Sequence, residues 1–322
     1  MKILVVGKSN RLYWCEHVAS AFRTLGHEVQ LFAVNRIPLH KRLLKKLASL
    51  VTPDLGVRLL AREFGARLKR YRPDMVLFVS PFFLPLELVV ALDESPVHAI
   101  KVGWVGDSLV GTQKAMADYF DHLYVTDTGF IAQAISIGMT RVSYLPLAFN
   151  AEYFSNRRRS ARDGIVFVGA YTAARRELLE QLGDVRLQVI GPDWGRLRSA
   201  SHGVTSRNID IRQLADEYNH HAAVLNIKNE QNVINGLSMR PFEAAACGAV
   251  VVSDEVDDIN ECFDRDREIL VYSSATELNM LCERIIGQKD FATRIAAAGE
   301  RRVNAEHTFV HRAEVMLRDL TA

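Results

Sequence analysis

Short runs of apolar, often β-branched residues alternate along this chain of 322 residues with stretches of helical periodicity. Between the first two runs, Trp14, Val18 and Phe22 recur at helical spacing, and the pattern stops at Gly26. Strands that alternate with helices in this way predict an α/β fold with parallel sheets. In the first half of the chain the runs are KILVV, EVQLFAV, MVLFVS, HAIKVGWV, HLYVTD and VSYLPL.

A polar, cationic stretch without apolar periodicity then interrupts the alternation. It reads NAEYFSNRRRSARDG and covers residues 150–164. The alternation restarts with GIVFVGAY and continues through RLQVIGP, AAVLNI, GAVVVSD and EILVYS. Because one hydrophobic core rarely supports a chain of this length, we predict two Rossmann-like domains that face an interdomain cleft. They would cover residues 1–150 and 165–304, joined by a linker over 151–164.

Composition narrows the class of protein. Hydrophobic residues make up 48% and charged residues 24% of the chain, which is typical of a soluble globular protein. The formal net charge of +2 gives no general case for nucleic-acid binding. The first ten residues hold too few apolar positions for a signal peptide, and no apolar run approaches the length of a membrane span, so we expect a cytoplasmic protein.

The four cysteines indicate neither a zinc site nor a disulfide framework, because none of them forms a pair at short spacing. They are Cys15, Cys247, Cys262 and Cys282.

A glycine loop followed by a helix is the most informative stretch of the sequence. It reads NGLSMRPFEAAACGAVVVSD and covers residues 235–254. The helix should begin near Arg240, because Pro241 fits a first helical turn, and should end at Gly248. Gly236 would let the backbone approach a ligand closely, and the free N–H groups and dipole of the helix start would suit a diphosphate.

Glu243 lies in this helix, directly before a run of small apolar residues. A carboxylate early in a helix can simply favour the helix dipole. The flanking residues Ala244–Cys247, however, predict a helix that is packed on several sides, where a charge needs a partner. A pair of ribose hydroxyls would provide one.

The same stretch resembles a known family. NGLSMRPFEAAACGAVVVSDEVDDINECF, followed by EILVYSSATEL and GERRVNAEHTFVHRAE, is similar to the donor domain of GT-B glycosyltransferases. Within them it resembles the group-1 (family 4-like) enzymes and their CgeB-like, spore-maturation branch. The resemblance covers roughly residues 165–315 by motif. It implies a GT-B fold whose C-terminal helix, over 305–322, packs back on the first domain, and it implies that Glu243, as the second glutamate of an E-x7-E pattern, binds the nucleotide ribose.

The chain departs from the family pattern on the sugar side of the donor. Asn235 stands where the first glutamate of E-x7-E lies beside the transferred sugar. The family's diphosphate cations correspond here to Arg175 and Arg176, shifted along the sequence, and a solvated helix start is the alternative interpretation. Lys228, which follows a strand, is a second cationic candidate, with a surface lysine as the alternative. The residues assigned to the donor and its nucleotide are Gly169, Arg175, Lys228, Gly236, Leu237, Ser238, Met239, Arg240 and Glu243.

In the first half, KVGWVGDSLVG resembles the family strand that ends in a His-Asp pair near the acceptor. Asp107 matches the aspartate, and Gly106 takes the place of the histidine. For an inverting enzyme Asp107 would be the general base, and for a retaining enzyme, which the resemblance favours, it would orient the acceptor. A helix N-cap is the alternative role. Three residues after the first strand, Gly7, Ser9 and Asn10, would face the same cleft.

No metal or other cofactor is expected. GT-B enzymes resemble one another in stabilising the leaving diphosphate by a helix dipole and cations instead of Mg²⁺. The acidic cluster of residues 254–258 is therefore interpreted as caps and solvated turns.

A basic segment of the first half has two possible interpretations, one of which is contact with a membrane. Lys41, Arg42, Lys45 and Lys46 lie on one helical face of residues 39–51, with leucines on the other. A solvated amphipathic helix is the default interpretation. The alternative is peripheral contact with an anionic membrane, at its inner face, because relatives act on lipid-linked or surface polysaccharide acceptors.

These observations predict a glycosyltransferase of the hexosyltransferase type, with Asn235 and Asp107 as its candidate catalytic residues. It would move a sugar from a nucleotide-sugar donor to a hydroxyl of a glycan, glycolipid or other glycoconjugate, without nucleic acid as a partner. Two alternatives remain open. One is a non-catalytic sensor or scaffold that binds sugar nucleotides, and the other is a nucleotide-sugar epimerase.

Overall fold

The computed structural model describes residues 1–9, 14–35, 54–109, 114–157, 162–183, 185–197, 202–230 and 232–321. Three of the predictions above involve residues outside these ranges. They concern Asn10, the basic segment over 39–51, and part of the linker, residues 158–161.

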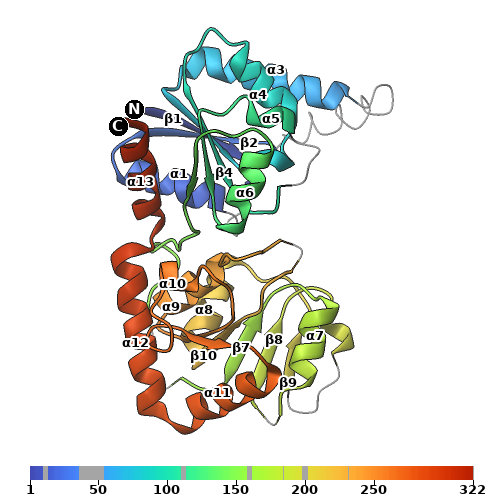
Figure 1. Ribbon diagram of the computed structural model, residues 1–322, viewed down its shortest axis with the longest axis vertical. Coiled ribbons are helices and arrows are strands. Elements are labelled where there is room, and N and C mark those ends of the chain that lie inside the picture. Colours follow the sequence, from blue (N-terminus) through green and yellow to red (C-terminus); the bar gives the residue numbers. More distant parts are fainter. Residues whose placement is uncertain are drawn as a thin grey trace. The chain divides into compact units, whose positions relative to one another are not determined.

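The chain divides into two compact units. One consists of Met1–Leu145 together with Ala313–Ala322, and the other of Pro146–Arg312. Each unit contains one six-stranded sheet in which all the neighbouring strands are parallel (Figure 1). The predicted α/β fold with two Rossmann-like domains is therefore confirmed.

The first unit has the strand order β2-β1-β3-β4-β5-β6. Its strands are β1 (Lys2–Gly7), β2 (Glu28–Ala33), β3 (Met75–Val79), β4 (Ile100–Val105), β5 (His122–Val125) and β6 (Val142–Tyr144). Its helices are α1 (Trp14–Thr24), α3 (Leu55–Tyr71), the 3-10 turn η1 (Pro81–Phe83), α4 (Leu86–Asp93), α5 (Lys114–Ala117) and α6 (Gly129–Ser136).

The first sheet is apolar on both faces, as strands of a covered parallel sheet must be. All five residues of β3 are buried. Phe64 of α3, Leu88 of α4 and Phe130 of α6 pack in one core cluster with side chains of β1 and β3. Tyr124 of β5 donates a hydrogen bond to Asp319, 3.2 Å away, which ties the residues after Arg312 to this unit.

The second unit has the strand order β12-β11-β10-β7-β8-β9. Its strands are β7 (Ile165–Val168), β8 (Leu187–Ile190), β9 (His202–Thr205), β10 (Ala223–Asn226), β11 (Val250–Asp254) and β12 (Leu270–Tyr272). Its helices are α7 (Ala173–Glu180), the 3-10 turn η3 (Trp194–Arg196), α8 (Ile211–His220), α9 (Met239–Ala246), α10 (Ile259–Cys262), α11 (Ala275–Gly287) and α12 (Lys289–Glu306). The last helix, α13 (Phe309–Thr321), begins in this unit.

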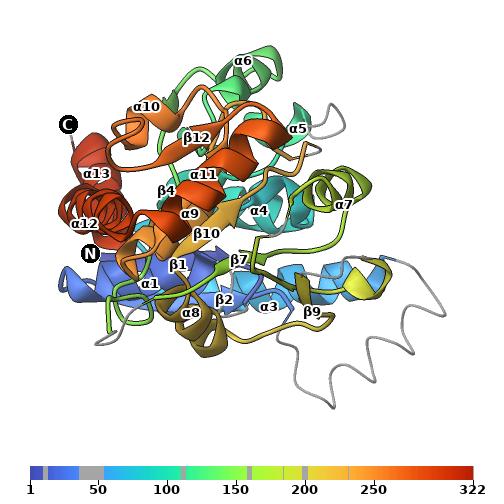
Figure 2. The same cartoon turned by 90° about the horizontal axis from the view of Figure 1, so that it is seen from below.

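Helices cover both faces of the second sheet, with α7 and α11 on one side and α8 on the other (Figure 2). Leu179 of α7, Cys282 of α11 and Ile295 of α12 share one core cluster with the strands. Helix α9 contacts both α8 and α12. The helix predicted from sequence over Arg240 to Gly248 is thus α9, and Gly248 ends it with the positive φ of 72° that favours glycine.

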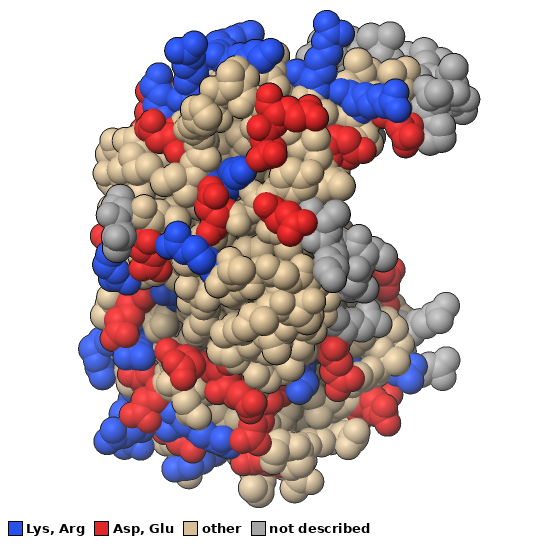
Figure 3. Space-filling model, turned by 45° about the horizontal axis from the view of Figure 1, so that its top comes forward, with Lys and Arg blue, Asp and Glu red and all other residues tan. Residues whose placement is uncertain are grey.

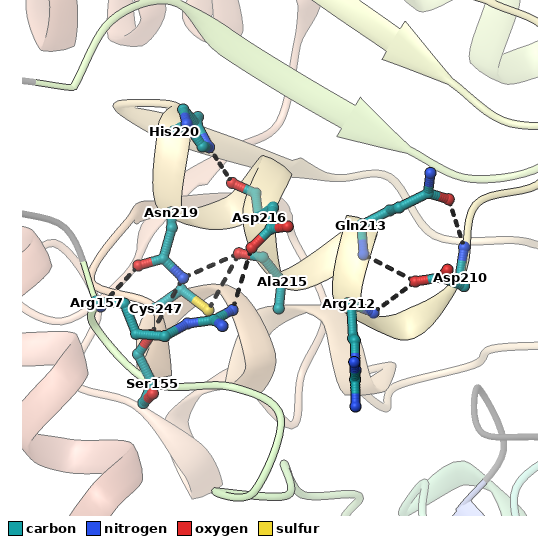
Figure 4. Close-up of polar contacts among 10 residues, drawn as sticks. All are labelled: Ser155, Arg157, Asp210, Arg212, Gln213, Ala215, Asp216, Asn219, His220 and Cys247. Carbon is teal, nitrogen blue, oxygen red and sulfur yellow. Dashed lines mark hydrogen bonds and ion pairs between the residues drawn. The ribbon is translucent and has the colours of Figure 1, made fainter.

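A short segment before residue 158 is held on helix α8 by paired amide hydrogen bonds (Figure 4). The Asn219 side chain accepts from the Arg157 backbone N–H at 2.9 Å and donates to the Ser155 carbonyl at 3.1 Å. The guanidinium of Arg157 also reaches Asp216, at 3.4 Å. At its start α8 carries a capping box between Asp210 and Gln213, which satisfies N–H groups of its first turn.

The turn between α12 and α13 is fixed by a buried arginine. Arg312 donates to the carbonyls of Pro146 and Leu147, at 2.7 and 2.9 Å, and to Nδ1 of His307. Burial and the neighbouring Arg312 charge lower the pKa of His307 to about 3, so its ring is neutral. It stacks on Phe263, with ring centroids 5.9 Å apart.

Charges of both signs are interspersed over the face shown in Figure 3, in keeping with a net charge of only +2. Within the described residues, no helix is both long and apolar enough to span a membrane.

Trp14 occupies the space beside Gly106, which directly follows β4. Its ring stacks on that of Trp104, with centroids 4.8 Å apart. A Cβ atom added at Gly106 would lie 2.3 Å from the Trp14 ring. This residue is therefore a glycine because the indole leaves no room for any side chain.

We expect Gly106→Ala to destabilise the protein by about 1 to 3 kcal/mol, the usual cost of overpacking a core. The measurement is the free energy of unfolding in urea. Gly65→Ala is the matched control, because nothing lies within 4 Å of a Cβ added at that position in α3. That variant should be neutral or gain up to about 1 kcal/mol. Equal stabilities of the two variants would contradict the packing argument.

Candidate functional site

Polar side chains of three elements meet at the C-terminal edge of the second sheet. Asn226, the last residue of β10, is only 3% exposed. Its side-chain oxygen accepts from Ser238 Oγ at 3.1 Å and from Arg240 Nη1 at 2.7 Å. Its side-chain nitrogen donates to Ser253 Oγ of β11 at 2.9 Å. One amide therefore joins the ends of β10 and β11 to the start of α9.

Two guanidinium groups lie against the ring of Phe167 in the adjacent strand β7. The guanidinium carbons of Arg175 and Arg240 are 5.4 and 5.5 Å from its centroid. Arg240 donates to the Val168 carbonyl at 2.9 Å. Burial, and then the charge of Arg240, lowers the pKa of Arg175 to about 10. Two positive charges are thus held near each other, with Arg175 buried and Arg240 half-buried.

Arg175 ties the loops after β7 and β10 together. It donates to the Ile227 carbonyl through Nε and Nη2, at 3.2 and 2.7 Å, and to the Ala170 carbonyl at 3.0 Å. Its side chain is buried, whereas Arg176 is partly exposed and forms an ion pair with Glu180. Arg175 therefore holds the loops after β7 and β10 together and adds a positive charge to the site. Arg240 is less buried, so it is the better placed of the two arginines to contact a ligand.

Glu243 lies one helical turn after Arg240 and is 6% exposed. Burial raises its pKa to about 8, and the Arg240 charge opposes that rise. Among the described residues its carboxyl group has no hydrogen-bond or ion-pair partner. The carboxyl group therefore remains protonated at neutral pH until a ligand or solvent satisfies it.

Asp254, the last residue of β11, lies on the same edge of the sheet. Its Oδ2 accepts from the backbone N–H of Lys228 at 2.9 Å. Burial raises its pKa, and the Lys228 N–H, the Lys228 charge and the Arg240 charge oppose the rise. The Asp254 charge in turn raises the pKa of Arg175, so this carboxylate acts as a counter-charge to both guanidiniums.

The glycine loop directly before α9 forms another part of the site. Gly236 and Leu237 are buried, and the Asn235 carbonyl accepts from the Asp258 N–H at 3.0 Å. Ser238 precedes the helix without capping it, because its hydroxyl donates to Asn226 instead. The first N–H groups of α9, at Met239 and Arg240, lack an earlier carbonyl partner within the helix.

Gly169 must be a glycine for close packing. A Cβ atom there would lie 2.8 Å from the Phe167 ring and 3.3 Å from Nη2 of Arg240. Its carbonyl accepts from the indole N–H of Trp194 at 2.7 Å. The backbone at the end of β7 is therefore held directly against the cationic group.

The donor-side residues predicted from sequence all belong to the second unit, and most of them gather at this edge. Sequence reasoning did not include Asn226, Phe167 and Ser253 in the site, and it assigned Asp254 to a solvated turn. Asn226 could have been identified from the sequence, because it is a polar residue at the end of the apolar run AAVLN. The acceptor-side residues Gly7, Ser9 and Asp107 belong to the first unit.

In the first unit, Asp107 follows β4 and is half-buried. Burial raises its pKa, and the Lys8 charge opposes that rise. Ser9 is 5% exposed, and its hydroxyl donates to Glu16 while its N–H donates to Asn35 at 2.7 Å. Gly7 ends β1, where a Cβ atom would lie 2.8 Å from the sulfur of Cys15. Within this unit Ser9 is thus a structural residue of the loop, whereas Asp107 keeps a perturbed carboxyl group at a strand end.

Residues 173–318 match a protein family described as glycosyl transferase-like. No curated protein sequence matches the chain.

Solved structures match the whole chain. Sucrose-phosphate synthase from Thermosynechococcus elongatus is 14% identical, with a TM-score of 0.70 over 99% of this chain and 98% of that one. HepE from Anabaena in complex with UDP is 13% identical, with a TM-score of 0.68 over 100% of both chains. The lipopolysaccharide outer core galactosyltransferase WaaB, in its apo form, is 15% identical, with a TM-score of 0.64 over 99% of both chains. The chain therefore has the GT-B fold.

We expect Glu243→Gln to stabilise the ligand-free protein at high pH. The pKa of Glu243 is about 8 in the folded protein and close to the ordinary value of about 4.3 in the unfolded chain. Its contribution to stability is complete below the unfolded pKa and is lost as the pH rises through about 8. Glutamine has no proton to lose, so the difference in Tm between variant and wild type should grow from pH 5 to pH 9.

Glu255→Gln is the control, because this exposed carboxylate pairs with Arg265 on the surface. Its Tm difference from wild type should change little with pH. A Glu243→Gln difference that stays constant from pH 5 to pH 9 would show that Glu243 is ionised at neutral pH.

Proposed function

We propose that the chain is a glycosyltransferase that binds a nucleotide-sugar donor at the C-terminal edge of the second sheet and transfers its sugar to an acceptor hydroxyl. The observation that carries this proposal is the pair of guanidiniums of Arg175 and Arg240 around Phe167, beside the start of α9. Helix start and cations together form a site for an anion.

The charge balance of the ligand-free site supports an anionic ligand. Arg175, Arg240 and Lys228 contribute three positive charges, and Asp254 contributes one negative charge. Glu243 is neutral at pH 7 because its pKa is raised to about 8. The ligand-free site therefore holds an excess of positive charge, which favours an anionic group such as a diphosphate.

The match to the glycosyl transferase-like family over residues 173–318 supports the same ligand class. HepE, which shares the fold, was solved in complex with UDP-glucose. We further propose that the chain belongs to the group-1, CgeB-like branch of hexosyltransferases, on the resemblance of residues 235–263.

Each residue of the site then has a role. The loop and helix start from Gly236 to Arg240 would bind the diphosphate, with Lys228 beside them, and Asn235 would lie by the sugar. Glu243 would accept hydrogen bonds from the ribose hydroxyls. Stabilisation of the departing nucleoside diphosphate by these fixed dipoles and cations would supply much of the rate without a metal ion.

For the acceptor we propose a glycan, glycolipid or other glycoconjugate. A retaining reaction is favoured by the donor-side resemblance, and Asp107 would then orient the acceptor hydroxyl. In an inverting reaction its raised pKa would suit a general base.

The direct test is incubation with a panel of nucleotide sugars and assay for free nucleoside diphosphate. Release of nucleoside diphosphate, with or without an acceptor, supports the proposal. A rise in Tm without release of nucleoside diphosphate would identify a non-catalytic sensor. This alternative has to be excluded because position 235 is an asparagine and not a glutamate. A changed sugar without release would identify an epimerase.

We expect Arg240→Gln to weaken the binding of UDP at least tenfold, while the affinity for uridine stays the same. A hydrogen bond to a charged group contributes about 1.5 to 3 kcal/mol, and tenfold in Kd corresponds to about 1.4 kcal/mol. Titration calorimetry measures UDP, and ligand-observed NMR measures uridine.

Arg265→Gln removes a surface arginine that pairs with Glu255, and it should leave both affinities unchanged. Arg240→Lys keeps the charge and should keep part of the affinity for UDP. An equal loss for UDP and uridine in Arg240→Gln would show that Arg240 only braces the strand ends.

A further inference from the structure

The sugar side of the site lacks the carboxylate that the family places there, because position 235 is an asparagine. An asparagine side chain offers one acceptor oxygen and no charge. Hydroxyl groups of a sugar bind more strongly to an ionised acceptor than to a neutral one. Another carboxylate near position 235 could take the place of the absent glutamate.

Asp254 lies next to the segment that contains Asn235. The Asn235 carbonyl accepts from the N–H of Asp258, 3.0 Å away, in the turn that directly follows Asp254. On its other side, Asp254 is joined to the residue two positions after β10 by the Lys228 N–H, at 2.9 Å. The Asp254 carboxylate thus lies at a strand end near the cations, and the turn that follows it contacts the Asn235 loop.

The contacts of Asp254 leave part of its carboxylate available. Oδ2 accepts one backbone N–H, and Oδ1 lies 3.4 Å from Ser253 Oγ, a hydroxyl that also donates to the Asp254 carbonyl at 3.0 Å. A carboxylate can accept about four hydrogen bonds. The residue is half-buried, so part of its surface is accessible to a ligand.

We propose that Asp254 binds hydroxyl groups of the donor's sugar and thereby replaces the glutamate that is absent at position 235. This inference rests on the proposed function. It makes Asp254 a specificity residue for a neutral sugar that bears hydroxyl groups, because a carboxylate at this point repels a sugar that carries its own carboxylate or phosphate there.

A purely structural role would be that of a counter-charge to Arg175 and Arg240. The two roles differ in what they do to the donor and to its leaving group. Loss of a counter-charge changes the field at the diphosphate, which UDP and UDP-glucose share. Loss of a sugar contact affects UDP-glucose alone.

The experiment measures the Kd of UDP and of UDP-glucose, and of GDP and GDP-mannose, for wild type and Asp254→Asn by titration calorimetry. Asparagine keeps an oxygen that accepts the Lys228 N–H, so the turn should fold as before. We expect the ratio of the Kd of the nucleotide sugar to that of its diphosphate to rise about tenfold, the effect of one lost charge-assisted hydrogen bond.

Asp257→Asn is the matched control, because this exposed aspartate lies in the same turn and carries the same charge. Its ratio should equal that of wild type. An unchanged ratio in Asp254→Asn, or an equal change in Asp257→Asn, overturns the assignment and leaves the proposed function standing. Failure of the wild type to bind any nucleotide sugar of the panel overturns the proposed function, and this assignment with it.

Discussion

The second unit is organised around two arginines that are held against one phenylalanine ring. Their positive charges repel each other, and burial of Arg175 removes much of the water that would screen this repulsion. The arrangement persists because backbone carbonyls at the ends of β7 and β10 accept from both guanidiniums, and because Asn226 accepts from Arg240. Those carbonyls lie at the C-terminal ends of the strands, so the fold determines where the two arginines are held.

This dependence explains the choice of residues around the cluster. Gly169 lacks a side chain because Phe167 and Arg240 already occupy its surroundings. Ser238 gives up its capping hydrogen bond and donates to Asn226. Ser238 and Gly169 thus help to position Arg240 instead of stabilising the local helix start or turn. This pattern is expected where a functional site, and not stability, determines the choice of residues.

Much of the fold could be predicted from the sequence, because strand and helix periodicities in a parallel α/β protein are strong local signals. Helix α9 and its glycine end followed from Pro241 and Gly248 alone. The packing of the site could not be predicted in this way. That Arg175 is buried instead of solvated, and that Asn226 joins three elements, depends on which strands are neighbours, and the order β12-β11-β10-β7 is not encoded locally. Gly106 is similar, since the Trp14 ring beside it belongs to α1, which is far from β4 in the sequence.

In the proposed complex, the pKa of Glu243 would depend on both the diphosphate and the ribose of the nucleotide. A diphosphate beside Arg240 would partly neutralise the one charge that lowers the pKa of Glu243, and this would favour the protonated acid. Ribose hydroxyls that donate to the carboxylate would favour the ionised form. The hydroxyls act through direct contact in a buried place, whereas the diphosphate acts through Arg240, so the ribose effect should be the larger one. A complete nucleotide would then release the proton that the empty site retains, and the buried acid would discriminate a ribonucleotide from inorganic diphosphate by its ionisation as well as by its shape.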